Sequence, residues 1–152
     1  MAFNWCYTWD VDVDQYNLVP FIDANKKDNK NYWSIYEKET FSEETLALRE
    51  IIQEHIGSVN YMGVWDYFEG FVDDLGPHID KADDIAVFFC PRGELTVTMH
   101  DKETKEVLDT EVLDNTNAMS LYHTEFMHDI HGVGDLVVFG VTPKDLNYFM
   151  KR

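Results

Sequence analysis

The chain has 152 residues, 45% hydrophobic and 14% aromatic, which favours one folded domain and excludes a disordered chain. Its 12 basic and 29 acidic residues give a net charge of −17, which disfavours nucleic acid and anionic membranes as partners. The two cysteines, Cys6 and Cys90, do not suggest a disulfide framework. No signal peptide or membrane-spanning run is recognisable, so we expect a cytoplasmic protein.

Residues 1–58 are predicted to form an N-terminal extension with one clear element, an amphipathic helix at residues 42–56. Residues 23–31 are polar and aperiodic and predict an exposed loop. Thr40 and Glu43 form a capping-box pattern before the helix, and Gly57 supplies its stop. One helical stripe collects Leu48, Ile51, Ile52, His55 and Ile56. Such a stripe has to be buried, so we expect the helix to cover a sheet.

Residues 59–142 are predicted to form a β core, because the hydrophobic period changes to two. The expected strands lie near residues 61–72, 85–90, 95–99, 107–113, 118–122, 127–131 and 136–141, with a turn at residues 91–93. About seven short strands after one helix predict an antiparallel β-sandwich or small barrel with the helix packed outside. Residues 143–152 are expected to form a C-terminal tail, and residues 1–152 a single domain.

His78 and Asp80 follow Gly76 and Pro77 at the start of an apolar strand. Residues two apart in an extended segment point to the same side, so this imidazole and carboxylate can be neighbouring metal ligands. His128 and His131 lie on a later strand pattern, and either one can supply a third ligand. Two histidines and one carboxylate on one face of the metal suit non-haem Fe(II).

Four stretches carry a resemblance to a known superfamily: residues 76–80 (Gly-Pro-His-Ile-Asp), 93–97 (Gly-Glu-Leu-Thr-Val), 118–128 and 134–139. Together they resemble the double-stranded β-helix (jelly-roll barrel) domain shared by cupins and the Fe(II)/2-oxoglutarate-dependent oxygenases. The resemblance covers a little under half of the chain. It implies that His78, Asp80 and His128 are the metal ligands, with Asp129 or His131 as supporting residues that orient an imidazole. His131 stays open as the alternative third ligand.

The two branches of this superfamily differ at positions that can be compared here. Cupins usually carry a second histidine where this chain has Asp80, and the glutamate they place a few residues later falls near Ile85 or Ala86. This difference favours the oxygenase branch. The basic residue that would pair with 2-oxoglutarate is not found near Val138, and the nearest cations are Lys144 and Arg92. Some relatives place this residue on the strand after the His-x-Asp pair, and the resemblance therefore makes Arg92 the candidate. Tyr122 is expected to line the pocket for the cofactor together with Phe88 and Trp65.

The expected function is a mononuclear non-haem Fe(II)-dependent oxygenase (dioxygenase), with 2-oxoglutarate as a candidate cosubstrate and a small molecule or peptide as substrate. The alternative is a cupin-type metalloprotein that does not use 2-oxoglutarate, such as an isomerase, a lyase or a small-ligand binder. A third reading is a metal-free ligand-binding or interaction module. An exposed strand edge also makes a homodimer plausible.

Overall fold

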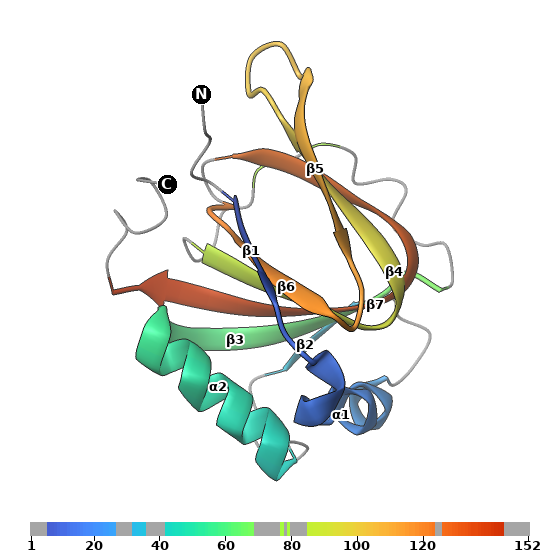
Figure 1. Ribbon diagram of the computed structural model, residues 1–152, viewed down its shortest axis with the longest axis vertical. Helices are drawn as coiled ribbons and strands as arrows, with labels where there is room; N and C mark the ends of the chain where they lie inside the picture. The colour runs from blue at the N-terminus through green and yellow to red at the C-terminus, as the bar shows by residue number, and fades with distance from the viewer. Residues whose placement is uncertain are drawn as a thin grey trace.

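Strands dominate the computed structural model (Figure 1), which describes residues 6–26, 32–35, 42–68, 77, 79, 85–123 and 126–144. The strands are β1 (Cys6–Asp10), β2 (Tyr32–Ile35), β3 (Gly57–Asp66), β4 (Ile85–His100), β5 (Val107–Leu113), β6 (Asn117–Leu121) and β7 (Met127–Pro143). The helical segments are a 3-10 turn (Val13–Tyr16), α1 (Leu18–Asn25) and α2 (Glu43–His55). The prediction of a mainly β fold is confirmed.

All the described strands belong to one open antiparallel sheet with the order β1-β6-β4-β7-β3-β2, and β5 pairs with β4. β1 and β2, both within the predicted N-terminal extension, join this sheet as the two ends of this strand order. α1 also begins before the predicted loop at residues 23–31 and includes its first three residues. In the described part of the chain, neither helix is long enough to cross a bilayer.

β4 and β7 form one long antiparallel ribbon, from the pairing of Ile85 with Val141 to that of His100 with Met127. The predicted turn at residues 91–93 is therefore wrong, because β4 continues through it. The two strands predicted at residues 127–131 and 136–141 are likewise one strand, β7. The turn-forming residues instead produce a bulge between Phe89 and Arg92, where the ribbon bends without ending.

Glycines allow the two strands to bend at the same level. Gly93 has a φ of +85°, and Gly132, on the facing strand, has a φ of +128°. A Cβ atom on Gly93 would lie 2.1 Å from the carbonyl oxygen of Val133, and one on Gly132 would lie 2.4 Å from that of Glu94. Side chains do not fit at these close approaches, so glycine is required on both strands.

The bend turns the β5 end of the sheet over the rest of it, as Figure 1 shows. The buried side chains form two cores. The inner core lies between the two halves of the sheet and contains mainly Ala86, Phe88, Cys90, Leu95, Val97, Met99, Leu113, Met119, Leu121, Leu136 and Val138. The helix-side core lies under α1 and α2 and includes Leu18, Phe21, Ile22, Leu48, Ile52, Val87, Phe89, Val137 and Phe139. This arrangement is compatible with a β-sandwich or jelly roll.

α2 covers the sheet as predicted, but its N-cap and its buried face differ from the prediction. The N-cap is Ser42, whose Oγ accepts a hydrogen bond from the Thr45 backbone N–H at 3.0 Å, whereas Thr40 lies outside the described residues. Thr45 is itself buried and donates to the carbonyl oxygen of Tyr16, so the first turn of α2 is bound to the preceding segment. Ile51 of the predicted stripe remains 42% exposed.

Candidate functional site

His128 is the one predicted metal ligand within the part of the chain that the structure describes; His78 and Asp80 lie outside it. On β7, His128 pairs with Met99 of β4. Paired residues in an antiparallel sheet point to the same face, and Met99 belongs to the inner core. His128 therefore faces the inner core, where it is almost completely buried.

The hydrogen bond of His128 determines which of its ring nitrogens can bind a metal. Its Nδ1 lies 3.0 Å from the carbonyl oxygen of Phe126. A carbonyl can only accept, so Nδ1 carries the proton, and in the neutral ring Nε2 carries the lone pair. A backbone hydrogen bond of this kind commonly supports a metal-binding histidine. The rings of Phe88 and of the buried His123 each lie 6.4 Å from the His128 ring, measured between centroids.

Asp129 and His131 face away from the inner core, because successive residues of a strand alternate between its faces. One Asp129 carboxylate oxygen lies 2.6 Å from Nε2 of His100, and the other lies 2.7 Å from Nε2 of His131. Asp129 is buried, whereas the His131 side chain is 60% exposed. The choice between His128 and His131 as the third ligand is therefore a choice between the two faces of β7.

The residues that the structure describes do not contain a complete set of metal ligands. No group of three or more His, Cys, Asp or Glu side chains in these ranges is arranged to hold a metal ion. His123 and His128 bring two imidazoles to the same end of the inner core. The donor chemistry of His128 fits a divalent transition metal, and a complete set needs residues outside the described ranges, such as His78 and Asp80.

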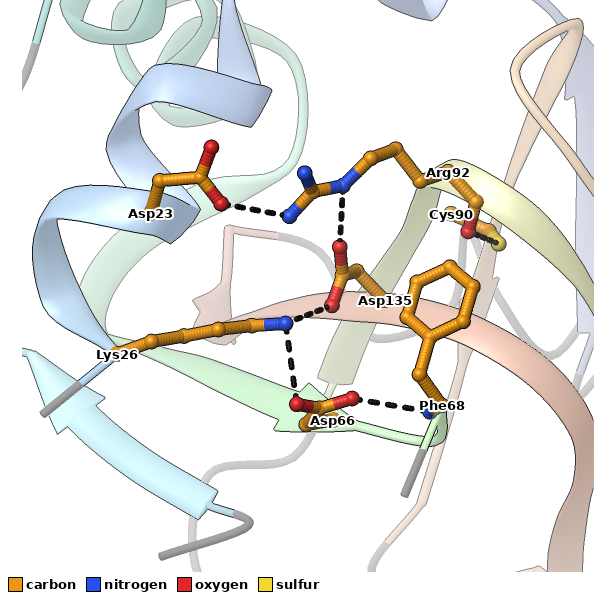
Figure 2. Close-up of polar contacts among 7 residues, drawn as sticks. All are labelled: Asp23, Lys26, Asp66, Phe68, Cys90, Arg92 and Asp135. Atoms are coloured by element: carbon orange, nitrogen blue, oxygen red, sulfur yellow. Dashed lines mark hydrogen bonds and ion pairs between the residues drawn. The ribbon is translucent and has the colours of Figure 1, made fainter. Parts of the chain in front are cut away.

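Arg92 takes part in a network of charged side chains at the bend of the sheet (Figure 2). Its Nε lies 2.6 Å from one carboxylate oxygen of Asp135, and a terminal nitrogen lies 2.8 Å from Asp23 of α1. The second oxygen of Asp135 lies 2.7 Å from Nζ of Lys26, which also contacts Asp66 at 3.1 Å. The network thus joins the end of α1 to three strands.

The carboxylates of this network favour the charged forms of its two cations. The Asp135 side chain is fully buried, and a nitrogen of each cation lies within 2.7 Å of one of its oxygens. Burial by itself would lower the pKa of Lys26, but the hydrogen bonds and charges of Asp135 and Asp66 outweigh this effect and raise the pKa. Burial likewise opposes the rise in the pKa of Arg92, which Asp23 and Asp135 produce.

The position of Arg92 bears on its predicted role. Arg92 pairs with Asp135 of β7, seven residues along that strand from His128. The bend at Gly132 lies between these two positions, so they belong to different regions of the ribbon. The guanidinium of Arg92 makes its ion pairs with two carboxylates, those of Asp135 and Asp23.

The residues predicted to line the cofactor pocket separate between the two cores. Phe88 belongs to the inner core and Trp65 packs against it. Tyr122 packs against the helix-side core, and its ring makes an edge contact with Phe126, with centroids 6.0 Å apart. Phe88 and Trp65 thus share the side of the sheet that His128 faces.

Sequence reasoning missed two features. The ion pairs around Asp135 were not predicted, because Gly134 and Asp135 are residue types common in loops and Lys26 lies in a polar run. The second feature is a cavity of about 310 Å³ between α2 and the sheet, which we call the helix-side cavity. Its only signal in the sequence is a serine, Ser120, within an apolar strand.

No protein-family model matches the chain, and a search of the curated proteins finds no match either. The resemblance to the double-stranded β-helix proteins therefore rests on the residues quoted above.

Proposed function

We propose that the chain is a mononuclear metalloprotein of the double-stranded β-helix type that acts on a small molecule. Its metal is Fe(II), with His78, Asp80 and His128 as ligands. The observation that carries the proposal is the state of His128, a buried imidazole whose Nδ1 is bound to a backbone carbonyl at the end of the inner core. Two histidines with one carboxylate are a ligand set that favours Fe(II).

The surroundings of His128 support this role. Phe88 and Met99 belong to the apolar inner core, so water is excluded from one side of the imidazole. The hydrogen bond to Phe126 fixes the orientation of the ring, and the ring of His123 lies beside it, with centroids 6.4 Å apart. The metal itself, when bound, supplies redox or Lewis-acid chemistry to the substrate.

The position of Arg92 favours the branch of this superfamily that does not use 2-oxoglutarate. A 2-oxoglutarate-dependent oxygenase needs a cation for the distal carboxylate of the cosubstrate. Arg92 was the candidate, and Asp135 and Asp23 already neutralise it. We therefore favour a cupin-type metalloprotein, and a 2-oxoglutarate-dependent dioxygenase is the second candidate.

Metal analysis of purified protein tests the proposal. We expect about one Fe(II) per chain after anaerobic loading, and His128→Gln should lower the metal affinity at least tenfold, since even supporting residues contribute 10–100-fold. His131→Gln and the surface variant His55→Gln are the matched controls and should keep the metal. Wild-type protein that binds no metal would refute the proposal. Loss of metal in His131→Gln alone would move the site to the other face of β7.

A 2-oxoglutarate titration of the Fe(II)-loaded protein separates the two candidates. We expect no change in the visible absorption of the loaded protein at millimolar 2-oxoglutarate. A saturable new absorption band would favour the dioxygenase and contradict the role that we assign to Arg92.

A further inference from the structure

The helix-side cavity lies on the face of the sheet that α1 and α2 cover. It has a volume of about 310 Å³ and is partly open to solvent. The residues that line it include Trp9, Tyr16, Leu48, Ile52, Phe89 and Ser120. Most of this lining is aromatic or aliphatic, as is usual for sites that bind small organic molecules.

This cavity is separate from the surroundings of His128. Phe89 and Ser120 line the cavity, whereas their chain neighbours Phe88 and Met119 point into the inner core. The sheet itself therefore lies between the cavity and His128, and a ligand in one does not contact the other.

The hydroxyl of Ser120 is a polar group in the lining of the cavity. Its side chain is fully buried, and Oγ has no hydrogen-bond partner among the residues that the structure describes. A buried hydroxyl without a partner costs about 1–3 kcal/mol, so an alanine would be the better residue if this position served packing alone. A ligand atom that bonds to Oγ would remove this cost.

The lining also indicates the charge of the ligand. None of the described residues that line the cavity is Lys or Arg, and the single imidazole among them, that of His55, lies in the last turn of α2. The chain as a whole carries a net charge of −17. A carboxylate or phosphate would therefore find no Lys or Arg among these residues to pair with and a repulsive field around the cavity, so a neutral molecule fits best.

The volume of the cavity and its exposed apolar edge limit the size and shape of the ligand. A 150 Å³ apolar cavity is known to hold benzene, so about 310 Å³ has room for roughly twelve non-hydrogen atoms. Ile51 lines the cavity and is 42% exposed, so the apolar surface extends to the opening. An extended apolar chain can lie along this surface while its polar end reaches Ser120.

We propose that the helix-side cavity binds a neutral, largely apolar molecule with one hydroxyl or carbonyl group, which hydrogen-bonds to Oγ of Ser120. The site is independent of the proposed metal centre and does not rest on it.

Calorimetric titration with 1-nonanol, which has about ten non-hydrogen atoms, tests this proposal. We expect saturable binding to the wild-type protein and at least tenfold weaker binding of nonanoate at pH 8. Ser120→Ala should weaken nonanol binding about five- to tenfold, which corresponds to one hydrogen bond of 1–1.4 kcal/mol. It should leave the binding of n-butylbenzene, which has the same size but no hydroxyl, unchanged.

A second experiment blocks the opening of the cavity with a bulky side chain. Ile51→Trp should block both probes, whereas Val112→Trp, at an equally exposed valine on β5, should bind them like the wild-type protein. Circular dichroism checks that each variant is folded. The proposal is overturned if nonanol does not saturate the wild-type protein, if nonanoate binds as tightly, or if the two tryptophan variants behave alike.

Discussion

Replacing Asp135 with asparagine would measure how strongly the bend of the sheet depends on one buried charge. The fully buried carboxylate lies 2.7 Å from Nζ of Lys26 and 2.6 Å from Nε of Arg92. Asparagine keeps the volume of the side chain but leaves both cations without the partner they share. Removing one partner of a buried ion pair costs about 3–5 kcal/mol. Lys26 keeps Asp66 and Arg92 keeps Asp23, so we expect the lower end, about 3 kcal/mol.

Urea unfolding of the wild-type protein and the variants would test this value. Asp66→Asn is the matched control, because among the described residues Asp66 makes one ion pair in this network, with Lys26 at 3.1 Å; we expect a loss of about 1 kcal/mol. Lys26→Met and the double variant Lys26→Met/Asp135→Asn complete the set. The loss of unfolding free energy in the double variant should be smaller than the sum of the losses in Lys26→Met and Asp135→Asn, because the double variant has no lysine charge left unpaired. A loss below about 1 kcal/mol for Asp135→Asn, or strict additivity, would refute the reasoning.

Two further variants test the bend and the inner core. Gly132→Ala places a Cβ 2.4 Å from the carbonyl oxygen of Glu94 at a φ of +128°, so we expect a loss of at least about 2 kcal/mol, and a melting temperature lower by about 4–8 °C; an unchanged melting temperature would contradict the close-approach argument. Burial raises the pKa of the Cys90 thiol from 9.0 to about 12, so the unfolded chain loses this proton first and stability should fall as the pH rises from 9 towards 12. Unfolding experiments at pH 8 and pH 10 should therefore show that Cys90→Ala lacks about 1.4 kcal/mol of the wild-type decrease, and equal decreases in both proteins would show that the thiol does not contribute.

The elements that were predicted correctly depend on local patterns. α2 has its hydrophobic residues at helical spacing and acidic residues in its first turn, and it forms within one residue of the predicted bounds. The apolar run that begins at Ile85 formed a strand for the same reason. By contrast, Pro91 and Gly93 are typical of turns and predicted one at residues 91–93. The glycines on β7 allow both strands to bend together, so β4 bends at this point and continues.

The candidate site was less predictable because its residues come from distant parts of the chain. His128 and His131 are three residues apart, and because both lie on β7 the alternation of the strand places them on opposite faces. The role suggested for Arg92 depended on a free guanidinium, and only the approach of Asp135, 43 residues later, engages it. The proposed ligands His78 and Asp80 stay a prediction from the sequence.

The sequence by itself determined the mainly β character of the protein and the position of its longest described helix, since hydrophobic periodicity over a few residues controls both. Only the tertiary structure decided where β4 and β7 bend, which charges surround Asp135, and that the cavity under α2 contains a serine hydroxyl with no hydrogen-bond partner among the described residues. These features arise where segments far apart in the chain meet. Their energies depend on burial and on distances between atoms, and neither is written in the local pattern of residues.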